Sequence, residues 1–288
     1  MKNRICIIVF TIVGLYLYSC SGTQRSTSPP HGGKMSGMDP SSNTSVNSEV
    51  QELSDSPRHH EWVTLTSGDR EFQAFVVYPQ SNTKTKSVIV IHENRGLNDW
   101  ARLFADKLAG EGYLVIAPDL ISNTKGKKRT SDFESPDAAR DALYDLDPEQ
   151  VTADLDAAFN YIKNDASSTG EVAVVGFCWG GSQTFRYATN NENISSAHVF
   201  YGTAPDDAQA LSRIKVPLYG YYGGDDNRVN ATIDKTEQQL KTANIPFDYL
   251  IYEGGGHGFM RSGYQPGASE ANKSAHDEAW KRLLDLLK

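Results

Sequence analysis

The chain has 288 residues, which is enough for one sizeable domain or two small ones, and its hydrophobic share of 39% is that of an ordinary globular protein. Its formal net charge is -8. Charges cancel within residues 1–57, so the negative charge belongs to the rest of the chain and argues against a nucleic-acid partner.

Residues 1–19 have the layout of a secretory signal peptide. Lys2 and Arg4 form a basic start, and an apolar run from Ile5 to Leu17 follows that is shorter than the roughly 20 residues of a membrane-spanning helix. Leu17-Tyr18-Ser19-Cys20 resembles a bacterial lipobox, which implies cleavage before Cys20 and lipidation of its thiol. We therefore expect an exported lipoprotein of the cell envelope, on the periplasmic face of the outer membrane. Cleavage without lipid and a retained N-terminal anchor are the alternatives.

Residues 20–57 have the composition of a tether. From Ser21 to Pro57 the chain is rich in Ser, Thr, Gly, Pro and Asn and has few large apolar residues, so it cannot bury enough surface to fold. One folded domain is expected over residues 58–288. Cys178 is the one cysteine of that domain, so no disulfide can form within the domain. Its thiol is therefore expected to be either buried and inert or a reactive group of the site.

Eight strand-like runs follow one another along the expected domain. The first two, Glu61 to Thr66 and Phe72 to Tyr78, flank Ser67-Gly68-Asp69, which suits a hairpin. The later runs are more continuously apolar, as expected of strands covered on both faces. They are Ser87 to Ile91, Tyr113 to Ala117, Val172 to Val175, Ala197 to Phe200, Val216 to Tyr222 and Phe247 to Ile251.

Helical patterns separate these runs. Asn98 can cap a first helix, and Asp147-Pro148-Glu149-Gln150 supplies an N-cap, a proline at the first helical position and a capping-box glutamine. Further helices are expected over Ser182 to Ala188, around Ile233 and Leu240, and through Trp280 to Leu287. This order predicts a three-layer α/β domain with a mostly parallel central sheet flanked by helices on both faces. Ligands bind such sheets at the carboxyl ends of the strands.

A candidate nucleophile follows the predicted strand that ends at Val175. The segment Gly176-Phe177-Cys178-Trp179-Gly180-Gly181 fits the nucleophile elbow of α/β-hydrolases, with cysteine in place of serine. Cys178 would stand at a helix N-terminus, where N–H groups and the helix dipole favour the thiolate, so we expect a lowered pKa. A buried structural cysteine beside a glycine-rich turn is the alternative.

A candidate base and acid follow two other predicted strands. His257 lies in a glycine-rich loop after the last strand, and Asp225 and Asp226 follow the strand that ends at Tyr222. The order Cys, Asp, His along the chain is that of α/β-hydrolases. Asp226 is preferred because Asp226-x-x-Val229 resembles the spacing of the acid in this fold, and Asp225 is the fallback. A simple turn or helix cap is the structural alternative for this pair.

Four segments together resemble the dienelactone hydrolase family. They are His92-Glu93-Asn94-Arg95-Gly96-Leu97-Asn98, Gly176 to Gly181, Gly223-Gly224-Asp225-Asp226, and Gly256-His257-Gly258-Phe259-Met260-Arg261. The first is the most specific, since a glutamate in this loop is a mark of the family. The resemblance implies an α/β-hydrolase that opens small carboxylic esters or lactones through a Cys178, His257 and Asp226 triad and an acyl-enzyme, without metal or organic cofactor.

The resemblance also implies roles around the triad. Glu93 would contact the resting thiol and help to remove its proton when substrate arrives. The backbone N–H groups of Asn94 and Trp179 would form the oxyanion hole.

Substrate-binding roles follow from the same resemblance. Arg261 and Arg140 would hold a substrate carboxylate, and Tyr144 and Tyr201 would line the pocket. Arg140 is equally well explained as a charge on a helix surface. The implied partners are a small ester or lactone and, through Cys20, a membrane; no oligomeric state is implied.

One segment departs from the family pattern. Residues 122–135 form a polar insert near the expected pocket mouth, with a run of cationic residues, and could change the substrate. A general carboxylesterase or glycan deacylase with the same triad is therefore an alternative. A catalytically silent surface-binding lipoprotein built on a hydrolase fold is a second.

Overall fold

The computed structural model describes residues 48–288. The predicted signal peptide, the lipid site at Cys20 and the tether up to residue 47 lie outside the described residues. Within the described part, no helix is long and apolar enough to span a bilayer.

The described chain contains one eight-stranded sheet, in the order β1-β2-β4-β3-β5-β6-β7-β8. The pairs β1/β2 and β2/β4 are antiparallel, and all other neighbours are parallel. The strands are β1 (His59–Ser67), β2 (Arg70–Tyr78), β3 (Thr85–Ile91), β4 (Leu114–Asp119), β5 (Ser168–Phe177), β6 (Ala197–Phe200), β7 (Leu218–Gly223) and β8 (Phe247–Tyr252). All eight predicted strands are confirmed, with ends shifted by a few residues.

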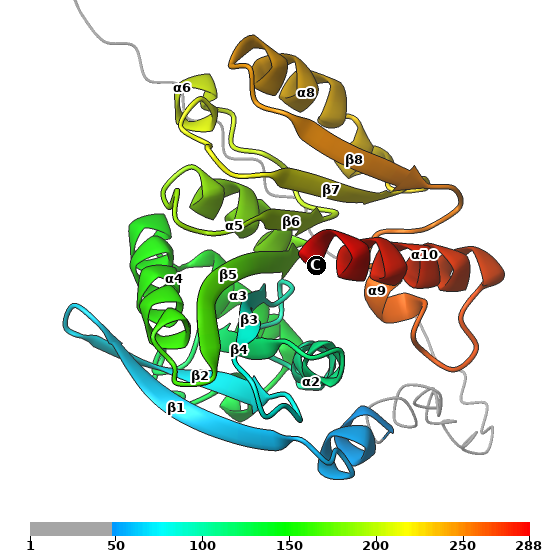
Figure 1. Ribbon diagram of the computed structural model, residues 1–288. Helices are drawn as coiled ribbons and strands as arrows, with labels where there is room; N and C mark the ends of the chain where they lie inside the picture. The colour runs from blue at the N-terminus through cyan, green and yellow to red at the C-terminus, as the bar shows by residue number, and fades with distance from the viewer. Residues whose placement is uncertain (1–47) are drawn as a thin grey trace, which may run out of the picture. The chain divides into compact units, whose positions relative to one another are not determined.

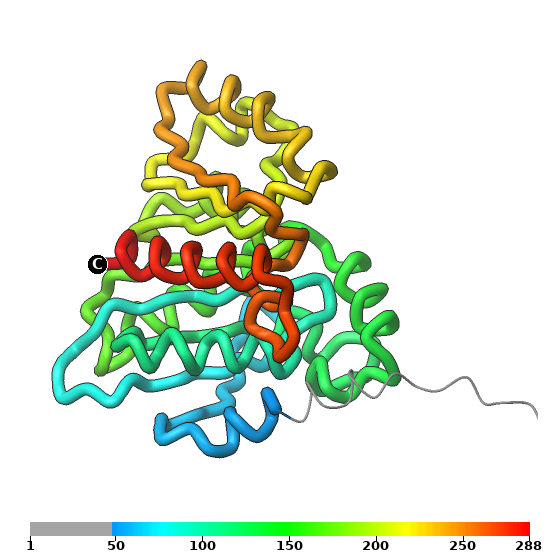
Figure 2. The backbone as a smooth tube through the Cα atoms, turned by 90° about the vertical axis from the view of Figure 1, so that its right-hand side faces the viewer, coloured from blue at the N-terminus to red at the C-terminus, as the bar shows by residue number. Residues whose placement is uncertain are grey.

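Helices cover both faces of this sheet. One face packs against α4 (Pro148–Lys163), α5 (Trp179–Ala188) and α8 (Ile233–Thr242), and the other packs against α2 (Asp99–Gly110) and α10 (Glu270–Leu287). In Figure 1, α4 and α5 lie across the sheet from α2 and α10, and Figure 2 shows the face that α2 and α10 cover. The predicted mostly parallel sheet between two helical layers is confirmed.

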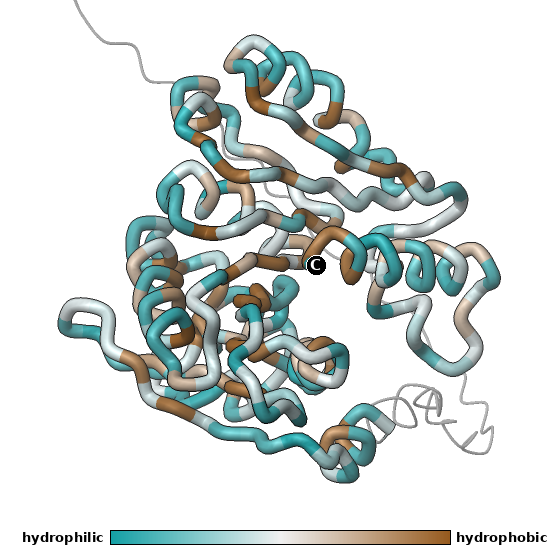
Figure 3. Tube along the Cα trace, in the orientation of Figure 1, coloured by the Kyte–Doolittle hydropathy of each residue, from teal (hydrophilic) through white to brown (hydrophobic). Residues whose placement is uncertain are grey.

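Apolar side chains from sheet and helices form a core on each face. Val151, Leu155 and Phe159 of α4 are almost fully buried on one face, and Phe104 and Leu108 of α2 on the other. Burying each such side chain stabilises the fold by about 1.5–3 kcal/mol. Figure 3 shows the resulting pattern, with hydrophobic residues along the strands and hydrophilic ones on the outward turns.

Helix caps follow the sequence prediction in two cases and depart from it in one. Asn98 caps α2 by accepting from the Ala101 N–H at 3.0 Å, and Asp147 caps α4 by accepting from the Glu149 N–H at 2.9 Å. The predicted capping-box role of Gln150 is wrong. Its side-chain NH2 group donates to Asp154 and to Ser67 at the end of β1, so the side chain extends toward the next helical turn and not back to the N–H of Asp147.

Several short helices lie in the loops between these elements. They are η1 (Thr130–Asp132), α3 (Pro136–Tyr144), α6 (Ala208–Leu211), α7 (Asn227–Asn230) and α9 (Phe259–Ser262). A further helix over residues 48–54 falls within the predicted tether. Leu53 of this helix is buried, and its Glu49 and Glu52 accept hydrogen bonds at 2.5 Å from Gln265 and Tyr264. The tether prediction therefore extends too far, because these residues fold against partners distant in the sequence.

Candidate active site

Cys178 occupies a sharp turn between β5 and α5. It has a φ of 55°, which is uncommon for a residue with a side chain and costs about 1–3 kcal/mol. The glycines on either side permit the turn: a Cβ on Gly176 would lie 2.2 Å from the Gly180 carbonyl oxygen, and one on Gly180 would lie 2.4 Å from the His92 carbonyl oxygen. The predicted strand-elbow-helix geometry is present.

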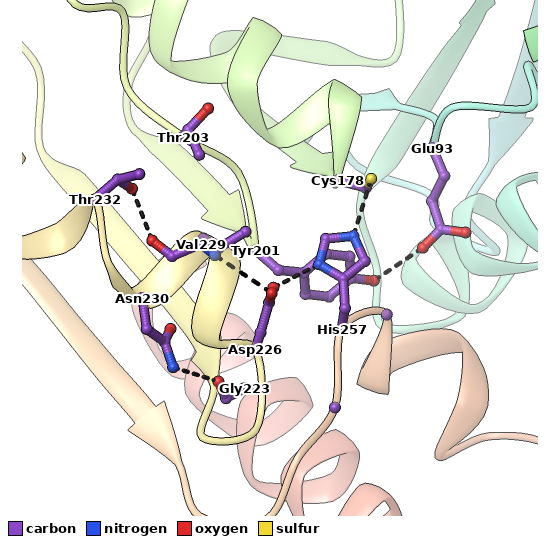
Figure 4. A network of polar contacts seen from close by, with 12 residues as sticks. Glu93, Cys178, Tyr201, Thr203, Gly223, Asp226, Val229, Asn230, Thr232 and His257 are labelled. Atoms are coloured by element: carbon purple, nitrogen blue, oxygen red, sulfur yellow. Dashed lines mark hydrogen bonds and ion pairs between the residues drawn. The ribbon is translucent and has the colours of Figure 1, made fainter.

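A continuous row of polar contacts joins three side chains from the ends of β5, β8 and β7. His257 Nε2 lies 3.0 Å from Cys178 Sγ, and His257 Nδ1 lies 2.5 Å from Asp226 Oδ2 (Figure 4). A carboxylate that accepts from Nδ1–H leaves the lone pair of Nε2 facing the thiol. Asp226 is buried and Asp225 is exposed, so the geometry selects Asp226 of the two candidates.

The electrostatic setting of Cys178 differs from the prediction. Burial and, after it, the charge of Glu93 raise the pKa of the Cys178 thiol to about 11, although a hydrogen bond from the Trp179 N–H acts in the opposite direction. Desolvation of the thiolate thus outweighs the helix N-terminus, and the predicted lowered pKa is wrong. At neutral pH the resting sulfur is a thiol, so a base must remove its proton before it can attack.

Glu93 lies in the loop after β3 and is nearly buried. Its Oε2 accepts from Arg261 Nε at 2.9 Å and its Oε1 accepts from the Tyr201 hydroxyl at 3.2 Å. Among the described residues no hydrogen bond joins Glu93 to Cys178, so the predicted resting contact with the thiol is not made. Glu93 influences the sulfur through its charge, while Arg261 neutralises part of that charge.

A cavity of about 730 Å³ opens above Cys178 and His257. This is within the usual range for a site that takes a small organic molecule. Its walls include Asn94 and Arg261 as well as Cys178 and His257. The N–H of Trp179, the other predicted oxyanion donor, forms a hydrogen bond with the Cys178 sulfur.

Of the three other residues predicted to line the pocket, one lines the cavity and two do not. Arg140 lines the cavity but forms ion pairs with Asp137 and Asp141 of its own helix, at 3.2 and 3.1 Å. Tyr144 is 62% exposed and lies outside the residues that line the cavity, because it ends α3 on the solvent side. Tyr201 is fully buried behind Glu93, so the prediction that both tyrosines line the pocket is wrong.

A buried carboxylate that was not among the predicted site residues supports the loop after β3. Asp119, at the end of β4, accepts from the N–H and the hydroxyl of Thr130, both at 2.7 Å. The Thr130 hydroxyl oxygen in turn accepts from the Leu97 N–H at 3.0 Å. Asp119 therefore fixes the loop that carries Glu93 and Asn94. Its position at the carboxyl end of a predicted strand was the available signal.

Two other cavity residues also escaped notice. Trp62 of β1 and Glu49 of the N-terminal helix both line the cavity. Trp62 falls in an ordinary strand pattern and Glu49 in the predicted tether, so neither stood out in the sequence.

Comparisons with known proteins agree with this geometry. The model of the dienelactone hydrolase family matches residues 72–288. A Salmonella typhimurium protein named "Putative carboxymethylenebutenolidase" is 31% identical over 233 residues, which cover 77% of this chain and 84% of the relative. An Escherichia coli protein of the same name is 29% identical over 219 residues, covering 73% and 79%.

Solved structures show the same fold. The crystal structure of a "Putative Dienelactone Hydrolase" from Klebsiella pneumoniae superposes with a TM-score of 0.69 and 23% identity, covering 80% of this chain and 98% of that one. The family match spans β3 to β8 and the loops that carry Cys178, Asp226 and His257. The chain belongs to the dienelactone hydrolase family, a family of hydrolases with the α/β-hydrolase fold.

Proposed function

We propose that this chain hydrolyses small carboxylic esters or lactones through an acyl-enzyme intermediate on Cys178. The observation that carries the proposal is the hydrogen-bonded row of Cys178, His257 and Asp226 at the floor of a cavity. Membership in a family named for a lactone hydrolase supports the substrate class.

The reaction follows from the positions of these groups. His257 takes the Sγ proton at Nε2 as the sulfur bonds to the acyl carbon, and Asp226 stabilises the imidazolium through Nδ1–H. The N–H groups of Trp179 and Asn94 stabilise the oxyanion. Collapse of the intermediate breaks the C–O bond, and His257 returns its proton to the leaving oxygen. Water, deprotonated by His257, then splits the thioester to the free acid and restores the thiol.

A substrate carboxylate gives this site a means of activating the thiol. The Arg261 side chain is bound to Glu93 but is 48% exposed beside the cavity, so an arriving carboxylate can pair with the same guanidinium. Arg261 then binds Glu93 less strongly, because it is shared with the substrate. The freed Glu93 carboxylate can act as a second proton acceptor for the Cys178 thiol. Without a bound carboxylate the thiol relies on His257 alone as its base, so neutral esters should react more slowly than carboxylated ones.

The direct test is a panel of neutral esters, carboxylated esters and lactones with the wild type and with Cys178→Ala. The wild type should turn over part of the panel, and mass spectrometry after rapid quenching should find the acyl group on the Cys178 peptide. Cys178→Ala should lose both signals while keeping its Tm, because only the nucleophile is removed. Substantial turnover by Cys178→Ala would end the proposal.

A general carboxylesterase with the same triad is the second candidate. The observation in its favour is that both predicted carboxylate-binding arginines already have acidic partners: Arg140 is paired with two aspartates and Arg261 with Glu93.

Arg261→Ala separates these two candidates. If Arg261 binds a substrate carboxylate, the change should lower kcat/KM for a carboxylated lactone by roughly 1.5–3 kcal/mol, the usual range for hydrogen bonds to charged groups. The value for a neutral p-nitrophenyl ester should change little. Equal losses on both substrates would favour the general esterase.

A further inference from the structure

The cavity extends well beyond the triad. Besides Cys178 and His257, its walls include Trp62 from β1 and the segment around Arg129 from the polar insert. Hydrolysis of an acyl group uses only the floor of this space. The remainder can hold the part of a substrate that is distant from the scissile bond.

The charged side chains of the cavity wall are unequally paired. Every carboxylate has a partner of its own: Glu49 has Gln265, Glu93 has Arg261, Asp99 has Arg102, Asp119 has Thr130 and Glu134 has Lys127. Three of the five arginines, Arg102, Arg140 and Arg261, are in ion pairs. Within residues 48–288, the ion pairs include neither Arg95, on the exposed rim, nor Arg129.

Arg129 is held as a binding group rather than as a loose surface charge. Its guanidinium carbon lies 4.0 Å from the centre of the Trp62 ring, and its Nε is buried without a hydrogen-bond partner in the described structure. Stacking on an aromatic face fixes the plane of a guanidinium and leaves its edge free for a ligand.

The backbone at Arg129 is fixed as well. Its N–H donates to Asp132 at 3.1 Å, and the adjacent Thr130 is held by two hydrogen bonds to Asp119. The Arg129 charge acts on the buried carboxylate of Asp119, but the two form no ion pair, and the Asp119 oxygens accept the hydrogen bonds from Thr130. A ligand that binds here therefore does not have to immobilise the Arg129 side chain, so binding avoids that entropy cost.

We propose that Arg129, stacked on Trp62, forms a second anionic subsite that binds a carboxylate on the substrate's distal end. This inference rests on the proposed function and specifies it further: the substrate is an ester or lactone with a carboxylate remote from the scissile bond. The planar, two-donor edge of a guanidinium suits a carboxylate, and the ring of Trp62 supplies apolar contact for the chain that carries it.

Matched esters test the subsite by kinetics. One pair is p-nitrophenyl pentanoate and the p-nitrophenyl monoester of hexanedioic acid, with the charge on the acyl side. The other pair is the acetyl esters of 4-hydroxybenzamide and 4-hydroxybenzoate, with the charge on the leaving side. Arg129→Gln should lower kcat/KM for the charged member of at least one pair about tenfold more than for its neutral partner, and Arg129→Lys should lie between the two.

Lys128→Gln is the control, because it removes the same charge from the neighbouring exposed residue, which does not line the cavity. Thermal unfolding of each variant shows that the fold is retained. Equal losses of Arg129→Gln on charged and neutral esters, or the same selectivity change in Lys128→Gln, would overturn the subsite and leave the proposed hydrolase intact.

Binding measurements in a variant that cannot turn over substrate test the Arg129 subsite independently of the proposed hydrolysis. By calorimetry, adding Arg129→Gln to Cys178→Ala should weaken hexanedioate binding about tenfold, while the affinity for neutral pentanamide should not change. If hexanedioate binding depends on Arg129 but the wild type hydrolyses no ester of the panel, the subsite is retained and the proposed reaction is rejected. Equal hexanedioate binding with and without Arg129→Gln would reject the subsite.

Discussion

At the scale of single residues, the state of Cys178 depends on its neighbours more than on its place at a helix N-terminus. The carboxylate of Glu93 and the burial of the sulfur both oppose the thiolate. Replacing the carboxylate by an amide removes one of these two causes. It also leaves the charge of Arg261 unopposed near the sulfur, which again favours the thiolate.

Glu93→Gln should therefore lower the pKa of Cys178. The expected result is faster alkylation of the resting enzyme by iodoacetamide at a fixed pH, and a thiolate absorbance that appears at lower pH than in the wild type. Turnover of a carboxylated substrate should nevertheless slow, because the second base is lost. An unchanged alkylation profile would mean that Glu93 does not act on the sulfur through its charge.

The proposed catalytic acid, Asp226, gives a second prediction at this scale. Asp226→Asn should reduce turnover by up to about 10⁴-fold, because an amide at this position favours the wrong imidazole tautomer and cannot stabilise the imidazolium. Asp225→Asn is the matched control, since this neighbouring carboxylate is exposed and makes no contact with His257. Its effect should stay within about twofold, as for other surface substitutions. The reverse ranking would assign the role to Asp225.

The candidate residues were predictable to different extents. Cys178 and His257 follow strands and stand in glycine-rich turns, so local sequence located both. The choice between Asp225 and Asp226 needed the structure, because adjacent residues in a turn point in opposite directions. The direction of the thiol pKa was also beyond the sequence, since desolvation is a sum over neighbours from many segments.

At the scale of elements, the loop after β3 depends on a bond to the neighbouring strand. Asp119 at the end of β4 is fully buried, and burial raises its pKa to about 6. A carboxyl group with a higher pKa in the folded state binds more protons there than in the unfolded state. Its contribution to stability is therefore largest below about pH 4 and is lost as the pH rises through 6.

Asp119→Asn tests this arrangement because an amide does not titrate. Between pH 4 and 7, the free energy of unfolding of the wild type should fall relative to that of the variant, by up to about 3 kcal/mol. Urea unfolding at a series of pH values measures the difference. A constant difference across this range would show that Asp119 is not forced to ionise in a buried site.

The elements themselves were predictable where the apolar pattern was long. Continuous runs gave the strands of the parallel sheet, and the spacing of Val151, Leu155 and Phe159 gave α4. Short helices such as α7 and α9 have too few turns to show a period. The helix over residues 48–54 was missed because its stability comes from tertiary partners and not from its own composition.

At the scale of the whole molecule, attachment to a membrane is a proposal that rests on the N-terminal sequence. Cys20→Ser should move the protein from the membrane fraction to the soluble fraction, because the thiol at the lipobox-like site is the proposed point of lipid attachment. The mass of the mature wild type should include the lipid. Unchanged membrane retention of the variant, together with a wild-type mass that lacks lipid, would reject the anchor.

The elevated pKa of Cys178 has a consequence outside hydrolysis. Peroxides and disulfides react with thiolates, and with a pKa of about 11 only about one sulfur in 10⁴ is ionised at pH 7. The resting enzyme should therefore resist sulfenic acid formation and mixed disulfides better than proteins with an acidic catalytic cysteine. Oxidation would become fast only while a bound carboxylate has released Glu93, so the enzyme would be most vulnerable to oxidants during turnover.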